Sequence, residues 1–194
     1  MISNRSKSID SSGIRKVFDL AAKLKDPINL SIGQPDFDAF EEIKTSTINA
    51  INNKKNGYTL TQGIPELRKK IQNLYGYQDT EDYNCLITSG VSGGIMLAYL
   101  AMLDPGDEIL IPDPYFVMYR DLATLINAKP VCYNTYPDFT IREEELEKSV
   151  NPKTKAIIIS SPGNPTGCAM TASEIEVLVS FAKKHQIWII FDEI

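Results

Sequence analysis

The feature that most constrains this fold is a regular alternation of short apolar runs with longer segments of helical periodicity. The runs, rich in β-branched residues, cover 85–88, 108–112, 130–133, 156–160 and 188–192. Between them, apolar residues recur every three or four positions over 91–103, 115–127, 142–150 and 173–184. This rhythm predicts an α/β fold, with a mainly parallel sheet and helices on both faces.

The first eighty residues follow another pattern. Helical spacing appears at 14–25, 40–53 and 65–75, and glycines mark turns between these segments. We expect a helical N-terminal arm over residues 1–40. A large domain over 41–194 would then contain the sheet.

Composition excludes several classes of function. The chain has 43% hydrophobic and 23% charged residues, as soluble globular proteins do. Its net charge of -5 argues against nucleic-acid binding. No apolar run approaches the roughly 20 residues that span a bilayer, and the polar start lacks a secretory core. One histidine and three scattered cysteines indicate a cytoplasmic protein with reduced thiols and without a metal site.

Ligands of parallel α/β sheets bind outside the carboxyl ends of the strands, so the residues after each run are the candidates. The run 85–88 leads into SGVSGG and a helix start. Backbone N–H groups of Gly90, Val91 and Ser92 there could hold a phosphate. The alternative is a tight turn capped by a serine.

Aromatic side chains follow the run 108–112. Tyr115, Phe116 and Tyr119 come directly after two prolines. A ring at this edge could stack on a flat ligand. The alternative is that these rings belong to the core.

The last two runs end on an amide and an acid. Asn164 lies between two prolines in SSPGNPTG, so its side chain can be aimed at little entropic cost; alternatively it caps its own loop. Asp192 closes the final run, where a buried carboxylate needs a positive or hydrogen-bonding partner; that partner could also be a local lysine or a helix end. Together the four strand ends suggest a pocket for a small, flat, phosphorylated heteroaromatic ring with a basic nitrogen.

With these motifs in order, the sequence resembles the class I/II aminotransferases, which are pyridoxal 5'-phosphate (PLP) enzymes of fold type I. The resemblance runs through LSIGQPDF, GYTLTQGIPELR, ITSGVSGGI, PDPYFVMY, SSPGNPTG and FDEI. It implies the N-terminal arm and most of a large PLP-binding domain, without its C-terminal part and the small domain.

The resemblance also implies roles for the cofactor-binding residues. Gly90, Val91 and Ser92 would hold the PLP phosphate. Phe116, with Tyr115 as the neighbouring choice, would stack on the pyridine ring. Two further residues would contact the ring's polar atoms: Asn164 the phenolic oxygen and Asp192 the pyridine nitrogen.

Substrate and partner contacts follow from the same resemblance. Gly33 would contact the substrate carboxylate, with Asn164 nearby. Tyr58 would reach the cofactor phosphate of a second subunit, which implies a homodimer with shared active sites.

The implied activity is transfer of an amino group between an amino acid and a 2-oxo acid. In the family a lysine beyond the FDEI motif forms a Schiff base with PLP, and this sequence ends at FDEI. We therefore expect no catalytic residue in this chain and no efficient turnover by it alone. The alternatives are a PLP-dependent β-lyase of the same fold, or a non-catalytic remnant that binds PLP weakly or only dimerises.

Overall fold

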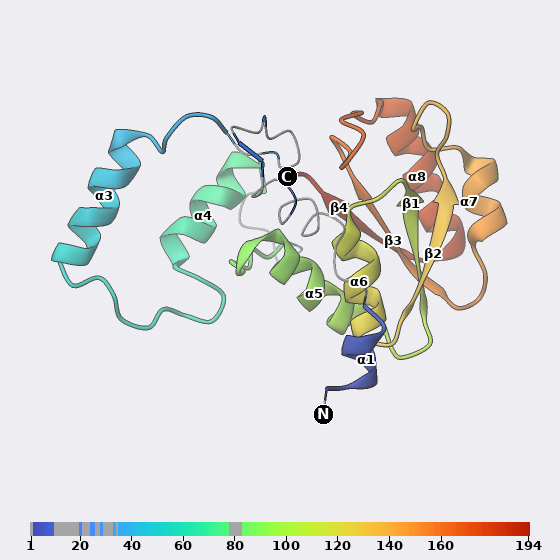
Figure 1. Ribbon diagram of the computed structural model, residues 1–194, viewed down its shortest axis with the longest axis horizontal. Helices are drawn as coiled ribbons and strands as arrows, with labels where there is room; N and C mark the ends of the chain where they lie inside the picture. Colours follow the sequence, from blue (N-terminus) through green and yellow to red (C-terminus); the bar gives the residue numbers. More distant parts are fainter. Residues whose placement is uncertain are drawn as a thin grey trace. The chain divides into compact units, whose positions relative to one another are not determined.

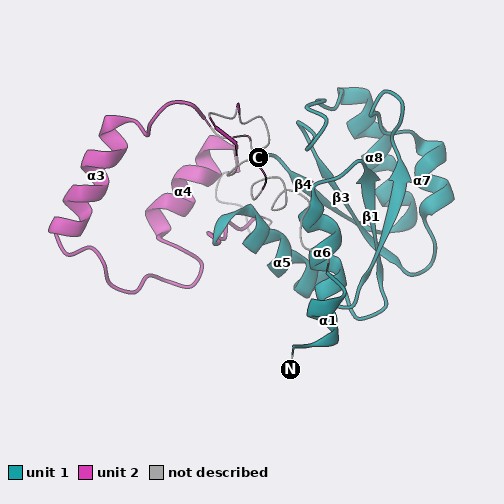
Figure 2. Ribbon diagram, in the orientation of Figure 1, with its two compact units in different colours: residues 1–10, 89–194 teal, residues 11–88 magenta. Residues whose placement is uncertain are grey.

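A computed structural model describes residues 2–9, 20, 24–25, 28, 33, 35–77 and 83–194. The chain divides into two compact units (Figure 2). Unit 1 comprises Met1–Asp10 and Ser89–Ile194, and unit 2 comprises Ser11–Thr88. The expected division into an arm and a large domain at residue 40 stays a prediction.

Unit 1 is an α/β sandwich (Figure 1). Its strands are β1 (Glu108–Asp113), β2 (Lys129–Asn134), β3 (Thr154–Ser160) and β4 (Trp188–Asp192). Its helices are α1 (Asn4–Lys7), α5 (Gly90–Met102), α6 (Val117–Leu125), α7 (Glu143–Ser149) and α8 (Ala172–His185).

The sheet has the order β2-β1-β3-β4, and every described strand pair is parallel. In the register of β3 and β4, Ile157 is paired with Ile189 and Ser160 with Asp192. The parallel α/β prediction is therefore confirmed, and all four carboxyl ends lie at one edge of the sheet.

The strands are apolar at successive positions because both faces of the sheet are covered. Ile109 and Ile158 join a core cluster with residues of α5 and α6. Leu110 and Ile157 join a second cluster with Leu146 of α7 and residues of α8. Figure 1 shows these two helix pairs on opposite sides of the sheet. Continuous burial of this kind is typical of parallel strands.

Helix α8 shows how the local sequence sets an element's ends. Thr171 and Glu174 form a capping box, in which each side chain accepts from the other's backbone N–H. Glu174 also accepts from the N–H of Ile141 at 3.1 Å, which ties the helix start to the segment before α7. The helix ends at Gln186, whose left-handed backbone has φ 54°.

The expected strand at 85–88 is wrong, because this segment is not part of the sheet. Its backbone groups are used elsewhere in unit 2. The N–H of Ile87 donates to the Gln62 carbonyl at 3.0 Å, and the Cys85 carbonyl accepts from the Arg68 guanidinium at 2.6 Å. The backbone groups of this segment thus bond to a loop carbonyl and to an arginine side chain, and not to a neighbouring strand.

Unit 2 contains α3 (Glu41–Asn52) and α4 (Pro65–Leu74). Their bounds agree closely with those of the helices predicted at 40–53 and 65–75. The expected helix at 14–25 lies largely outside the described residues. Neither α3 nor α4 has a buried residue. Within the described stretches, every helix is too short or too polar to serve as a membrane span.

Candidate functional site

A pocket of about 260 Å³ lies where β3 and β4 end and α5 begins. It is lined by Ser89, Gly90, Val91, Ser92, Phe116, Asn164, Asp192 and Ile194. Six of these residues were predicted from the strand ends, and the structure brings all six to this one pocket. Among the residues that the structure describes, those lining the pocket include no lysine and no arginine.

The first turn of α5 forms one wall of the pocket. The helix starts at Gly90, whose φ of 71° lies in the left-handed region that favours glycine. The Ser89 side chain makes no capping hydrogen bond, and the first turn carries no acidic residue. The positive end of the helix dipole is therefore not neutralised by the helix's own side chains.

Asp192 stands at the end of β4 and is only 7% exposed. Its Oδ2 accepts a hydrogen bond from the Tyr119 hydroxyl at 2.6 Å, and its Oδ1 accepts from the N–H of Ile194 at 3.2 Å. Burial, together with the hydrogen bond to Asp192, raises the pKa of Tyr119 well above its usual range. The phenol thus keeps its proton and acts as the donor.

Phe116 lines the pocket, and its neighbour Tyr115 is not among the lining residues. Phe116 immediately precedes α6 and packs edge-to-face on Tyr119, with ring centroids 5.7 Å apart. The Tyr115 hydroxyl instead accepts from the Arg120 guanidinium at 3.5 Å. The geometry therefore favours Phe116 as the ring that meets a ligand here.

The loop after β3 presents Asn164. The backbone N–H of Asn164 donates to Ser160 Oγ at 3.2 Å, and the N–H of Gly167 donates to the Gly163 carbonyl at 2.7 Å. A Cβ on Gly163 would lie 2.6 Å from Thr166 Oγ1, so any larger residue here would force the Thr166 side chain to shift. Close packing of the loop thus sets the place of the asparagine.

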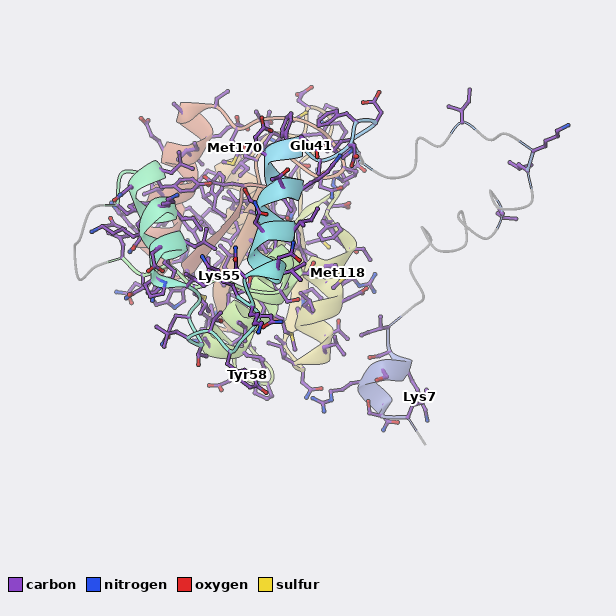
Figure 3. The ribbon with its side chains drawn as sticks, turned by 90° about the vertical axis from the view of Figure 1, so that its left-hand side faces the viewer. Lys7, Glu41, Lys55, Tyr58, Met118 and Met170 are labelled. Atoms are coloured by element: carbon purple, nitrogen blue, oxygen red, sulfur yellow. The ribbon has the colours of Figure 1, made fainter. Side chains whose placement is uncertain are left out.

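Two expected site residues belong to unit 2. Gly33 is exposed, and no atom of the described residues lies within 4 Å of where its Cβ would be. Tyr58 is fully exposed in the loop between α3 and α4 (Figure 3). Their predicted contacts with substrate and with a second subunit stay predictions.

The sequence did not reveal the link between Tyr119 and Asp192. It left open whether Tyr119 stacks on a ligand or belongs to the core, and the structure buries it in the core. For Asp192 it indicated a positive or hydrogen-bonding partner, with a local lysine or a helix end as the alternative. The available signal was the cost of burying a carboxylate, which calls for a donor close by. A tyrosine one helical turn beyond Phe116 supplies that donor.

Comparisons with known proteins agree with this architecture. The family model for aminotransferase class I and II matches residues 25–194. The chain is 39% identical to a probable aspartate aminotransferase of Methanocaldococcus jannaschii, over 100% of this chain and 52% of that protein. It is 37% identical to aromatic-amino-acid aminotransferase 2 of Thermococcus litoralis, over 100% of this chain and 51% of that protein. The chain therefore spans about half the length of these curated relatives.

Solved structures give the same result. An aspartate aminotransferase from Thermus thermophilus superposes with a TM-score of 0.92 at 29% identity, covering 100% of this chain and 53% of that one. The aspartate aminotransferase from Rhizobium meliloti gives a TM-score of 0.90 at 32% identity, covering 99% and 50%. The predicted fold, that of a fold-type I large domain, is thereby confirmed. Enzymes of this family depend on pyridoxal 5'-phosphate. With the family model matching most of its length, the chain belongs to the class I and II aminotransferases.

Proposed function

We propose that this chain forms the PLP-binding part of an enzyme that transfers an amino group between an amino acid and a 2-oxo acid. One observation carries the proposal: a buried carboxylate, Asp192, and the start of α5, whose first turn carries no acidic residue, line the same pocket. PLP carries a basic ring nitrogen and a phosphate, which require these two kinds of partner. Family membership supports the same reaction.

The helix start fits the phosphate end of the cofactor. Backbone N–H groups in the first turn of a helix have no partner within the helix, and the dipole there attracts anions. The first turn of α5 has no acid to repel a phosphate. Gly90, Val91 and Ser92 would hold the phosphate, with the left-handed Gly90 turning the chain into the helix.

The other lining residues fit the ring. Asp192 would accept a hydrogen bond from the protonated pyridine nitrogen, and Phe116 would cover one face of the ring. Asn164 would donate to the phenolic oxygen and lie near the substrate. Bound PLP supplies an electron-withdrawing ring that makes the α-proton of an amino acid easier to remove. The residues of this pocket would bind and orient that ring, and none of its described lining residues is a lysine, so we expect binding without efficient turnover by the 194-residue chain.

We further propose that the enzyme is a cytoplasmic homodimer with shared active sites. Tyr58 would contact the phosphate in the second subunit, and Gly33 the substrate carboxylate in its own. Three isoleucines of α3, Ile43, Ile48 and Ile51, are each more than half exposed within this chain, and burial against a second copy would cover them. The three free cysteines agree with a reducing compartment.

The test is a titration of the purified 194-residue chain with PLP, followed by absorbance and protein fluorescence. We expect saturable binding, which Asp192→Asn weakens at least about tenfold because it removes a charge-assisted hydrogen bond. Asp138→Asn, which changes an exposed carboxylate outside the pocket, should bind as the unaltered chain does. Pyridoxal, which lacks the phosphate, should bind much more weakly than PLP.

Absence of saturable PLP binding, or equal binding by both variants, would overturn the proposed site. Incubation with an amino acid and a 2-oxo acid then tests turnover. Amino transfer would contradict the expected inactivity of this chain. Release of ammonia from a β-substituted amino acid would point to lyase chemistry instead. Light scattering gives the mass in solution and tests the dimer.

A further inference from the structure

Tyr119 and Asp192 come from different elements and meet inside the protein. Tyr119 lies on α6 and is fully buried, while Asp192 ends β4 and is 7% exposed. The distance of 2.6 Å between the hydroxyl oxygen and Oδ2 is in the range of hydrogen bonds to charged acceptors. The pair is thus a short hydrogen bond directly behind the pocket surface.

The carboxylate is held at both oxygens. Tyr119 donates to Oδ2, and the N–H of Ile194 donates to Oδ1. Two donors from different directions fix the plane of the carboxylate. The Ile194 donor is a backbone group two residues away in the sequence. Among the described hydrogen bonds of this carboxylate, only the one from Tyr119 is donated by a side chain.

Ser160 lies near the same hydroxyl and contacts the Asn164 loop. Burial and Asp192 raise the pKa of Tyr119, and the Ser160 side chain acts to lower it. Ser160 Oγ also accepts the backbone N–H of Asn164 at 3.2 Å. Tyr119 therefore contacts Asp192 directly, and Ser160 contacts the backbone of Asn164.

We propose that Tyr119 is a positioning residue that holds Asp192 in the orientation needed to meet the ring nitrogen of the cofactor. This inference rests on the proposed function. Tyr119 acts through the carboxylate and does not line the pocket itself. The effect of Tyr119 on binding should therefore depend on whether the ligand has a ring nitrogen. A merely structural role would show no such dependence.

Tyr133 provides a matched control for removing a buried hydroxyl. It is 1% exposed and packs in the cluster on the other face of the sheet. Its hydroxyl has no hydrogen-bond partner among the described residues. Tyr119→Phe and Tyr133→Phe thus each remove one buried hydroxyl, but only the Tyr119 hydroxyl contacts Asp192.

The experiment compares PLP with its 1-deaza analogue, in which carbon replaces the ring nitrogen. We expect Tyr119→Phe to weaken PLP binding about tenfold, in line with the loss of one hydrogen bond to a charged group. The same variant should leave the affinity for the deaza analogue unchanged. Tyr133→Phe should change neither affinity. Equal losses for both ligands, or no loss for either, would overturn the positioning role.

A second measurement, without ligand, separates this inference from the proposed function. Unfolding of the chain with Tyr119→Phe, Asp192→Asn and both changes forms a double-mutant cycle. The combined effect should depart from additivity, while the cycle of Tyr133→Phe with Asp192→Asn should be additive. If the unaltered chain binds neither ligand, the proposed function fails. Additivity in the cycle of Tyr119→Phe with Asp192→Asn would refute the interaction between Tyr119 and Asp192, whether or not PLP binds.

Discussion

Ser160 and Asp192 are paired across the carboxyl ends of β3 and β4, and Asp192 lines the pocket. The N–H of Ser161 donates to the Asp192 carbonyl at 3.1 Å, which prolongs the ladder by one bond beyond β3. Ser160 Oγ in turn accepts the N–H of Asn164. The end of β3 therefore holds the acid and the amide of the pocket in one hydrogen-bonded unit.

Ser160→Ala should loosen the Asn164 loop. The change removes the acceptor of the Asn164 N–H, and a lost hydrogen bond costs about 1 kcal/mol of unfolding free energy. Hydrogen exchange at the Asn164 amide should become faster. Ser180→Ala, on the exposed side of α8, is the control and should not lower stability. Unchanged exchange at Asn164 in the Ser160 variant would contradict this account.

Gly63→Ala should destabilise unit 2. Gly63 has φ of 102°, and a Cβ there would lie 2.4 Å from Ile87 Cγ1. Strain of this kind costs about 1–3 kcal/mol. We expect faster hydrogen exchange at the Ile87 amide, which bonds to the carbonyl of neighbouring Gln62. Gly57→Ala is the control, because no atom in the described part of the chain lies within 4 Å of its Cβ position; equal effects of the two changes would refute the argument.

The four strands of the sheet could be predicted because their apolar residues occupy successive positions. Ile157, Ile158 and Ile159 alternate between the two core clusters, and a strand covered on both faces explains such a run. The segment 85–88 has a similar composition, yet it is not a strand. Apolar character does not reveal whether a ladder partner exists, and here Gln62 and Arg68 take the backbone groups instead.

The pocket was predictable to the extent that it follows from topology. Parallel strands end at one edge, so residues directly after them had to lie near one another. The hydrogen bond between Tyr119 and Asp192 joins residues 73 positions apart, through the packing of α6 on the sheet. Sequence spacing shows that a buried carboxylate needs a donor, but not which helix provides it.

Tyr133→Phe should not lower stability. The Tyr133 hydroxyl is buried without a partner among the described residues, which is unfavourable by about 1–3 kcal/mol if the site is dry. A hollow of about 50 Å³ beside it, also lined by Thr135 and Glu174, has room for a water that would reduce this cost. We therefore expect unfolding free energy to stay the same or rise.

Tyr99→Phe is the comparison, because the Tyr99 hydroxyl donates to the Tyr119 carbonyl at 3.3 Å. Its loss should cost about 1 kcal/mol in chemical denaturation. A loss of more than about 1 kcal/mol in Tyr133→Phe would show that its hydroxyl does have a stabilising partner.

Glu108, at the start of β1, should make stability depend on acid pH. Its side chain is buried, and burial alone would raise the pKa. Hydrogen bonds from Lys129 at 2.9 Å and Asn151 at 2.6 Å, with the charges of Lys129 and Lys153, outweigh burial and lower the pKa below its model-peptide value of 4.5. The folded state therefore holds the ionised form more strongly than the unfolded state does.

The sign of the pH effect follows from this lowered pKa. The stabilisation from Glu108 is fully present above pH 4.5 and is lost as the pH falls through the lower pKa of the folded state, because the unfolded chain takes up the proton first. Denaturation measured between about pH 3 and pH 6 should show a smaller decline for Glu108→Gln than for the unaltered chain. Parallel pH profiles for the unaltered chain and Glu108→Gln would mean that Lys129 and Asn151 do not favour the ionised carboxylate in the folded protein.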